Sequence, residues 1–408
     1  MLFENNIDDS FTKLLKCKEL LFVQDIDGVC IPLVSNPLDR VIDKSYVEEV
    51  SKLGNEFSVL TCGEHEGKRG VNRIIERAFE SETQPKEKGL YLPGLAACGV
   101  EYQDRFGNVE TLGLNQKERL FLSKIPLKIK DLLNIELLRN FPNIEKGKIE
   151  NEVEIAVCDT RYSPAINLNS LFNMVGSELE SRKRLQLIMK NVMDEVINYS
   201  VVSGLKNSFY LHISPNLGTH DKNEIIKYAT PEDIGTTDIQ LIIKGALKQA
   251  GLIVLINKYV FTRTGKYPFG EDFSVRDAPE TIQKLIDLCK TKIPNHQMPT
   301  LIGVGDTITS TKDQHSQQWL RGGSDRGFLT LIQKLGEAYN KENQIIFVDS
   351  SYGEVYRPST IDGNFDGITD ERDNLKFTIV MNRGPEQYKS WIKEFCKRRS
   401  RNLDAYNT

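Results

Sequence analysis

The stretch Leu20-Leu-Phe-Val-Gln24, which runs directly into Asp25-Ile-Asp27-Gly28-Val29, decides the fold. A short apolar run with a polar, glycine-containing end is typical of a strand that is buried on both faces of a parallel sheet. Gly28 allows the chain to turn sharply just after the strand. The stretch therefore predicts an internal strand with two carboxylates at its carboxyl end.

Two further apolar runs end in the same manner. Phe57–Leu60 leads into Thr61, and residues 300–303 lead into Val304-Gly305-Asp306. Helical patterns separate the runs, as at residues 44–53. Strands that alternate with helices predict a doubly wound α/β sheet, in which ligands bind beyond the carboxyl ends of the strands. We therefore expect the polar ends of all three runs to meet in one crevice.

Asp25 and Asp27 would point to the same side of the strand end, with Ile26 turned into the core. Two carboxylates this close repel each other, so one stays ionised while the pKa of the other rises, unless a cation lies between them. This arrangement suits one nucleophile and one general acid. The alternatives are an Asp pair that caps a turn and, for Thr61, an ordinary helix N-cap.

The acidic residues also suggest a metal site. Asp25, Asp306 and a backbone carbonyl would form an oxygen site suited to Mg²⁺. Asp325, in Gly322-Gly-Ser-Asp325, is a further acid at a predicted helix start, where a capping role explains it equally well. We count Asp25, Asp27, Asp306 and Asp325 as the candidate metal ligands.

Composition excludes several classes of protein. The 408 residues suggest two or three structural units, and a net charge of -4 leaves no basic excess for nucleic acid. The longest apolar stretch, residues 250–256, is too short to span a membrane, and residues 1–10 are acidic and polar, unlike a signal peptide. We expect a cytoplasmic protein that binds neither nucleic acid nor membranes.

The seven cysteines are scattered and never spaced as Cys-x-x-Cys. An odd number without such spacing argues against a disulfide framework or a zinc knuckle, and it fits a reducing compartment. Cys62, which follows Thr61, is expected to be an inert packing thiol.

The middle of the chain differs from its two ends. Between residues 112 and 214, helices near 171–179 and 187–196 accompany predicted strands at 153–158 and 209–214. The α/β pattern then returns. We predict a first core segment at 1–111, an inserted α+β cap at 112–214, and a second core segment at 215–408 that carries an additional helical insertion.

The strand-end residues Asp25, Asp27, Thr61 and Asp306 resemble those of the haloacid-dehalogenase (HAD) phosphatase superfamily, and the insertion resembles its C2-type cap. The resemblance implies a Rossmann-like HAD core. Within this class, Glu150 and Arg161-Tyr-Ser-Pro164 are similar to the cap of trehalose-phosphate phosphatases. Glu152 and Asp159 stand where that family carries Lys and His.

A closer resemblance, over nearly the whole chain, is to glucosylglycerol-phosphate phosphatases. It is carried by segments that include Gly63-Glu-His-Glu-Gly-Lys-Arg-Gly70, Ile302-Gly-Val-Gly-Asp-Thr307 and Arg321-Gly-Gly-Ser-Asp-Arg326. The resemblance implies a Mg²⁺-dependent phosphatase with Asp25 as nucleophile, Asp27 as acid and base, and Thr61 with a lysine on the phosphoryl oxygens. Lys222 is the favoured lysine and Lys244 the alternative.

The resemblance further implies glucosylglycerol 3-phosphate as substrate, a role in osmolyte synthesis under salt stress, and an upstream synthase as possible partner. The candidate substrate contacts are Glu64, His65, Arg69, Glu150, Glu152 and Arg161, and solvated charges and surface ion pairs are the plain alternative. Other sugar phosphates, a phosphomutase reaction and non-catalytic carbohydrate binding remain open.

Overall fold

The computed structural model describes residues 7–406 apart from residues 222, 232 and 315. Its main sheet has eight strands in the order β16-β15-β12-β1-β2-β3-β4-β5. In chain order, these strands are β1 (Leu20–Gln24), β2 (Phe57–Leu60), β3 (Gly94–Ala96), β4 (Glu101–Gln103), β5 (Val109–Thr111), β12 (Thr300–Gly305), β15 (Gln344–Val348) and β16 (Ile379–Met381). The strands predicted at the three apolar runs are thus confirmed.

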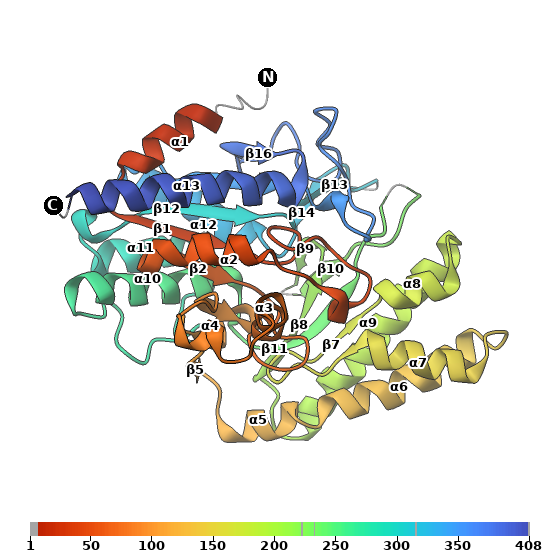
Figure 1. The fold of residues 1–408 in the computed structure, drawn as a ribbon. Coiled ribbons are helices and arrows are strands. Elements are labelled where there is room, and N and C mark those ends of the chain that lie inside the picture. The colour runs from red at the N-terminus through yellow and green to blue at the C-terminus, as the bar shows by residue number, and fades with distance from the viewer. Residues whose placement is uncertain (1–6, 222, 232, 315, 407–408) are drawn as a thin grey trace.

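The strands from β16 to β3 are parallel, and β4 and β5 add an antiparallel edge. Helices cover both faces (Figure 1). One face carries α1 (Ile7–Lys16), α2 (Lys44–Val50), α3 (Val71–Phe79) and α13 (Gly384–Tyr406), and the other carries α10 (Lys248–Thr264), α11 (Ile282–Lys292) and α12 (Arg326–Tyr339). The doubly wound α/β prediction is therefore confirmed.

β1 shows why an uninterrupted apolar run marks a central strand. Leu20 and Phe22 pack into the core under α13, whereas Leu21 and Val23 pack into the core under α10 and α12. Because successive side chains point to opposite faces, a strand between two helix layers needs apolar residues at every position. Each buried leucine or phenylalanine of this kind contributes about 1.5–3 kcal/mol of hydrophobic stabilisation.

The inserted unit lies at one end of the core (Figure 1). Its four-stranded antiparallel sheet has the order β6-β7-β11-β8 and is covered by helices. The strands are β6 (Val157–Cys158), β7 (Ala165–Asn167), β8 (Phe209–Ser214) and β11 (Asp238–Ile243), and the helices are α5 (Gln116–Leu122), α6 (Ile125–Asn140), α7 (Lys146–Ala156), α8 (Asn169–Val175) and α9 (Leu179–Val202).

Two expectations for the inserted unit need correction. The predicted strand at 153–158 is mostly the end of α7, because Ile149, Val153 and Ala156 are buried at helical spacing. The predicted boundary at residue 214 is too early, because β11 pairs with both β7 and β8 and so extends the unit to Ile243. We call this unit, from α5 to β11, the cap.

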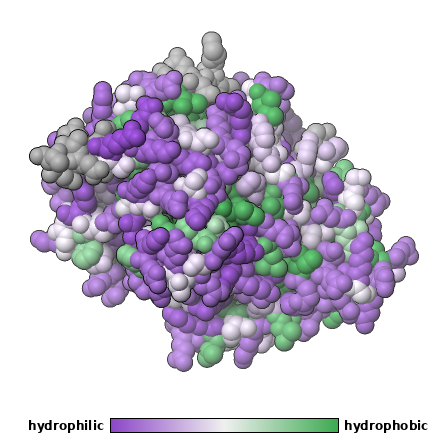
Figure 2. Space-filling view, viewed as in Figure 1, coloured by the Kyte–Doolittle hydropathy of each residue, from purple (hydrophilic) through white to green (hydrophobic). Residues whose placement is uncertain are grey.

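The remaining elements are short. They are α4 (Gln84–Glu87), the hairpin strands β9 (Asn216–His220) with β10 (Asn223–Ile226) and β13 (Thr309–Lys312) with β14 (Trp319–Gly322), and the 3-10 helices η1 (Pro37–Asp39), η2 (Ser51–Glu56), η3 (Ala97–Gly99), η4 (Asn295–Gln297) and η5 (Ser350–Tyr352). In the part of the chain that the structure describes, no helix has the length and apolar character needed to cross a bilayer. Figure 2 shows a mostly hydrophilic face on which hydrophobic side chains form small groups.

Candidate active site

The polar residues that follow β1, β2 and β12 lie at one edge of the sheet, as the strand-end argument requires. Asp25 follows β1, and its amide donates to the carbonyl of Val304 in β12 at 2.9 Å. Gly28 has a φ of 81°, and a Cβ there would lie 2.2 Å from the carboxylate of Asp306. Glycine is therefore required at this turn for both its conformation and the close approach of the two loops.

A buried lysine joins two of the acidic residues. Lys248 Nζ lies 2.5 Å from Asp25 Oδ2 and 2.6 Å from Asp325 Oδ1. The second oxygen of each carboxylate accepts from the backbone. Asp25 Oδ1 accepts from the amide of Ile26 at 2.8 Å, and Asp325 Oδ2 accepts from the amides of Asp306 and Thr307. These bonds fix the orientation of the carboxylates at the sheet edge.

Burial and charge shift the pKa of these groups. Burial raises the pKa of Asp25 to about 7, with the attraction of Lys248 opposing it. Burial, with repulsion from Asp325 and Asp25, raises the pKa of Asp306 well above its usual range. Burial lowers the pKa of Lys248, but the two carboxylates outweigh it and raise that pKa overall. Among the described residues, three carboxylates thus gather around Lys248, whose single charge only partly balances them when they are ionised.

The donor set fits a hard divalent cation. Oxygens of Asp25, Asp306 and Asp325 lie within 4.8 Å of one another, and Asp306 Oδ1 is buried with no hydrogen-bond partner among the described residues. Carboxylate oxygens at this density are the ligands that Mg²⁺ prefers. The carboxylate of Asp27, predicted as a fourth ligand, is not in the cluster. It instead pairs with Arg40 at 2.8 Å, because that guanidinium reaches it from beside η1.

A cavity of about 180 Å³ opens above this edge and lies between core and cap. On the core side it is lined by Asp25, Asp27, Thr61 and Lys248, which we call the core wall. On the other side it is lined by Asn167, Asn169, Asp238 and Gln240, which we call the cap wall. Arg357 lines it as well and donates to Thr237 Oγ1 of the cap at 3.2 Å.

The cap wall offers hydrogen-bonding groups that the protein itself does not use. Gln240 Oε1 and Asn169 Oδ1 are buried, and neither has a hydrogen-bond partner in the described part of the chain. Asn167 donates to Asp238 at 2.8 Å, and burial raises the pKa of Asp238. Buried acceptors without partners are rare in proteins unless a ligand or water satisfies them. Neutral amides of this kind suit the hydroxyl groups of a sugar.

The predicted substrate residues fall into two groups. Glu64 and Arg69 line the cavity, whereas the structure does not place His65, Glu150, Glu152 or Arg161 there. His65 instead faces the core, where its side chain is buried and its Nε2 lies 3.1 Å from the carbonyl oxygen of Gly94. Glu150 pairs with Lys146, and Arg161 pairs with Glu66. Both are exposed ion pairs, the alternative to substrate binding that the sequence left open. Glu152 lies on α7 with a buried, unpartnered Oε2.

The two residues that do line the cavity also join core to cap. Arg69 is paired with Asp159, and Glu64 accepts from the amide of Arg161 at 3.3 Å. Burial raises the pKa of Glu64 to about 7. Asp159 also contacts Lys68 at 3.2 Å. Part of the predicted sugar-binding set is therefore engaged in holding the cap against the core.

Lys222, the predicted phosphate-facing lysine, lies outside the described residues, so its role stays a prediction. Lys244, the alternative, is exposed at the end of β11. Within the described residues, the lysine that contacts Asp25 is Lys248, which sequence reasoning missed. The sequence did contain a signal. Lys248 is the first residue of a largely apolar helix, where a positive charge is unfavourable beside the helix dipole, so a lysine there indicates a specific role.

The cysteine expectation is also wrong in one respect. Cys62 and Cys98 form a disulfide that ties the residue after Thr61 to η3. Neither spacing nor composition indicated the bond, because the two cysteines meet only through the pairing of β2 with β3.

Comparison with known proteins agrees with this geometry. Carboxylates at the ends of parallel strands, with a buried lysine between two of them, form a site that suits the hydrolysis of a phosphate ester, and the comparison shows that the chain is a phosphatase. More narrowly, it belongs to the glucosylglycerol-phosphate phosphatase family, whose model matches residues 19–396.

Among individual proteins, the chain is 40% identical over 398 residues to the glucosylglycerol-phosphate phosphatase of Synechocystis sp., which covers 95% of this chain and 94% of the relative. The C-terminal domain of C. albicans trehalose-6-phosphate phosphatase is 11% identical with a TM-score of 0.48, covering 97% of this chain and 98% of that chain. A trehalose-6-phosphate phosphatase related protein is 10% identical with a TM-score of 0.40, covering 95% and 100%. The assignment rests on the family and the sequence relative.

Proposed function

We propose that the protein is a Mg²⁺-dependent phosphatase that hydrolyses glucosylglycerol 3-phosphate to glucosylglycerol and phosphate. The observation that carries the proposal is the contact of Lys248 with Asp25 and Asp325 beneath a cavity whose opposite wall is rich in neutral amides. The core wall suits a phosphate, and the cap wall suits an uncharged, hydroxylated leaving group. Membership of the family supports the same substrate class.

Asp25 is the nucleophile in this proposal. Its Oδ1 is held by the amide of Ile26, which leaves Oδ2 to attack phosphorus and form an aspartyl-phosphate. Lys248 would transfer its contacts to the phosphoryl oxygens, and the Thr61 hydroxyl would donate to them as charge spreads in the transition state. Mg²⁺, held by Asp25, Asp306 and Asp325, would reduce the repulsion between these carboxylates and the phosphate dianion.

Asp27 is the acid and base. It would protonate the sugar-alcohol oxygen as that oxygen leaves, and then take a proton from the water that hydrolyses the aspartyl-phosphate. Arg40 contacts both carboxylate oxygens of Asp27, at 2.8 and 3.1 Å, and holds the side chain in place. Because a third of the Asp27 side chain is exposed, it can reach both substrate and water.

Specificity would lie in the cap wall. Asn169 and Gln240 each present an unused oxygen acceptor, and Asn167 and Asp238 are already oriented by their mutual bond. A polar pocket built for one pattern of hydroxyls leaves its own groups unpaired with another sugar, which can reduce kcat/KM by up to about 10⁴-fold. Trehalose 6-phosphate and sucrose 6-phosphate are therefore expected to be poor substrates.

The test is phosphate release from glucosylglycerol 3-phosphate, trehalose 6-phosphate and sucrose 6-phosphate at equal concentration, each with Mg²⁺ and with a chelator. We expect release to be fastest with glucosylglycerol 3-phosphate and to be lost with the chelator. Faster release from trehalose 6-phosphate would refute the substrate while leaving the phosphatase class intact. Full activity in the chelator would refute the metal requirement.

The family further supports a physiological setting, which is also a proposal. The substrate would come from a glucosylglycerol-phosphate synthase in the cytoplasm, and the product would accumulate as a compatible solute under salt stress. Deleting the gene should cause the phosphorylated precursor to accumulate in salt. Unchanged glucosylglycerol in such a strain would contradict this setting.

A further inference from the structure

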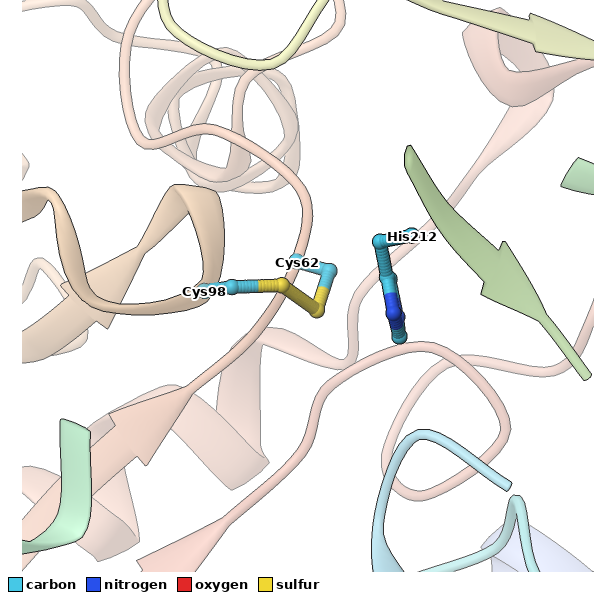
Figure 3. Close-up of side chains that lie close together, drawn as sticks. All are labelled: Cys62, Cys98 and His212. Atoms are coloured by element: carbon cyan, nitrogen blue, oxygen red, sulfur yellow. A yellow bond between two sulfur atoms is a disulfide. The ribbon is translucent and has the colours of Figure 1, made fainter. Parts of the chain in front are cut away.

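A second group of side chains that could hold a metal ion includes Cys62, the residue that follows Thr61. Cys62, Cys98 and His212 each offer one ligand atom, and these atoms lie within 4.8 Å of one another. Cys62 follows β2, Cys98 belongs to η3, and His212 belongs to the cap strand β8. Figure 3 shows the imidazole of His212 lying beside the disulfide. None of the three has a part in the proposed phosphatase reaction.

The state of His212 is what singles out this cluster. Its side chain is buried, and its Nδ1 lies 3.0 Å from Glu224 Oε1. A carboxylate accepts but does not donate, so Nδ1 donates to Glu224, and in the neutral ring Nε2 is the nitrogen that offers a lone pair. Nε2 is buried and has no hydrogen-bond partner among the residues that the structure describes. An imidazole that donates to a carboxylate through one nitrogen and presents the other is typical of a metal ligand.

Glu224 is itself fixed in place. Its Oε2 accepts from the amide of Ile213 at 2.6 Å and from Asn216 Nδ2 at 3.0 Å. The carboxylate therefore holds the ring of His212 in one orientation without help from a metal. Because the orientation of His212 is fixed in this way, its position beside the two cysteines is not the result of a freely rotating side chain.

There is also space beside the cluster. Cys62, Cys98, His212 and Glu224 line a second cavity of about 370 Å³, which Lys248 reaches from the catalytic side. A metal ion with three protein ligands requires a fourth, and an adjoining open volume allows water to supply it. The cavity also gives an ion access to the cluster.

We propose that Cys62, Cys98 and His212 form a Zn²⁺ site once the disulfide is reduced. A dithiol reductant converts the Cys62–Cys98 disulfide to two thiols and is itself oxidised to a disulfide. Zn²⁺ then displaces one proton from each thiol and binds two thiolates and Nε2. Zn–S and Zn–N bonds of about 2.3 and 2.0 Å place ligand atoms on one ion roughly 3.5–3.8 Å apart, so the two sulfurs must separate after reduction, while all three ligand atoms already lie within 4.8 Å of one another.

Reduction state decides whether this site exists. In the disulfide, both sulfurs are bonded to each other and neither is a thiolate, so the oxidised protein cannot bind zinc there. In the reduced protein, the ion would join β8 of the cap to the core loop that contains Thr61. A zinc-bound form would thus have its cap held on the core beside the substrate cavity, which Cys62 also lines.

The test uses Co²⁺ as a spectroscopic substitute for zinc, and it does not depend on phosphatase activity. The full chain is reduced with dithiothreitol, freed of it without oxygen, and titrated with Co²⁺ in excess Mg²⁺, so that the carboxylate site is occupied. We expect one Co²⁺ per chain with a thiolate charge-transfer band, which one equivalent of Zn²⁺ removes. Oxidised protein, with five free cysteines instead of seven, should show no band.

Variants identify the ligands. Cys62→Ser, Cys98→Ser and His212→Gln should each lose the band, while Glu224→Gln should weaken binding by about 10–100-fold. Cys289→Ser removes a buried free thiol of α11 and should leave the titration unchanged. Circular dichroism checks that each variant is folded, and the comparison of oxidised with reduced wild type needs no variant.

Three results would overturn the proposal. One is Co²⁺ binding by the reduced protein without a thiolate band. Another is a band that persists in folded His212→Gln. The last is a disulfide that dithiothreitol does not reduce, because the sulfurs would then never be available as ligands. None of these results would bear on the proposed phosphatase reaction.

Discussion

The two walls of the catalytic cavity are built on different principles. The core wall is charged, and its groups are already paired, with Lys248 on Asp25 and Arg40 on Asp27. The cap wall is largely neutral, and two of its acceptors, on Asn169 and Gln240, have no partner. A wall that carries out chemistry must hold its groups rigidly before substrate arrives, whereas a wall that selects a sugar keeps hydrogen-bonding capacity free for it.

The largest expected effect concerns the core wall. Asp25→Asn should reduce phosphate release by about 10⁴-fold or more, because an amide cannot act as the nucleophile. The variant should keep the wild-type circular dichroism spectrum. Folded Asp25→Asn that released phosphate at a tenth of the wild-type rate would show that the core wall does not form a covalent intermediate.

Lys248→Met should come next. Loss of the ammonium removes a donor to the phosphoryl oxygens and leaves two buried carboxylates uncompensated, so we expect kcat to fall by about 10²–10³-fold. We also expect an unfolding free energy lower by roughly 3–5 kcal/mol. Urea unfolding and phosphate release measure the two effects.

Lys244→Met is the matched control for Lys248→Met, because its side chain is exposed, and it should behave as the wild type. Lys222→Met in the same assays tests the prediction made from sequence. A greater loss of kcat in Lys222→Met than in Lys248→Met would return the phosphate-binding role to Lys222.

A third prediction concerns Glu101 of β4, whose buried carboxylate accepts from the amide of His65 at 3.0 Å. Burial raises the pKa of Glu101 to about 7, so the native state binds more protons than the unfolded state between about pH 4.5 and 7. The stability of the metal-free protein should therefore fall as pH rises through this window. Glu101→Gln should match the wild type at pH 4 and exceed it by on the order of 2–3 kcal/mol at pH 8.

Urea unfolding at several pH values measures this difference, and Glu48→Gln, an exposed position on α2, is the control. Identical pH profiles of Glu101→Gln and the wild type would mean that the carboxyl of Glu101 does not remain protonated in the folded protein.

The fourth prediction addresses the cap wall. Gln240→Ala should reduce kcat/KM for glucosylglycerol 3-phosphate by about 10–100-fold, since one hydrogen bond to the leaving group is lost. Release from a small aryl phosphate, which has no sugar, should change little. Equal losses with both substrates would mean that the cap wall supports the chemistry rather than the selection.

The smallest effect is expected outside both walls. Glu150→Gln removes one partner of an exposed ion pair on α7 and should change kcat/KM by less than about twofold. A tenfold loss for glucosylglycerol 3-phosphate would restore Glu150 to the substrate contacts predicted from sequence.

The same contrast explains what could be predicted from the sequence. Asp25, Thr61 and Asp306 each stand directly after an apolar run, so strand alternation and parallel pairing bring them together without further information. Gln240 and Asn169 are brought together only by the pairing of β7 with β11, which the sequence pattern did not indicate. The correction of the boundary at residue 214 has the same origin.

Glu150 and Arg161 lie outside the catalytic cavity for a different reason, and each forms an exposed ion pair. Their residue types suit sugar binding, but a residue type does not determine whether its side chain faces the cavity or solvent, so their contact with substrate stays a prediction. Lys248 was missed because its role depends on where α10 begins, and helix ends are poorly defined by pattern alone.

The position of α10 has a mechanical consequence. Only residues 244–247 separate β11, an inner strand of the cap sheet, from Lys248, whose ammonium lies against Asp25. A rotation of the cap would therefore pull on the backbone directly ahead of that ammonium. Movement of the cap, which admits substrate, would therefore change the position of the Lys248 ammonium relative to Asp25. A longer connection between β11 and Lys248 should uncouple the two.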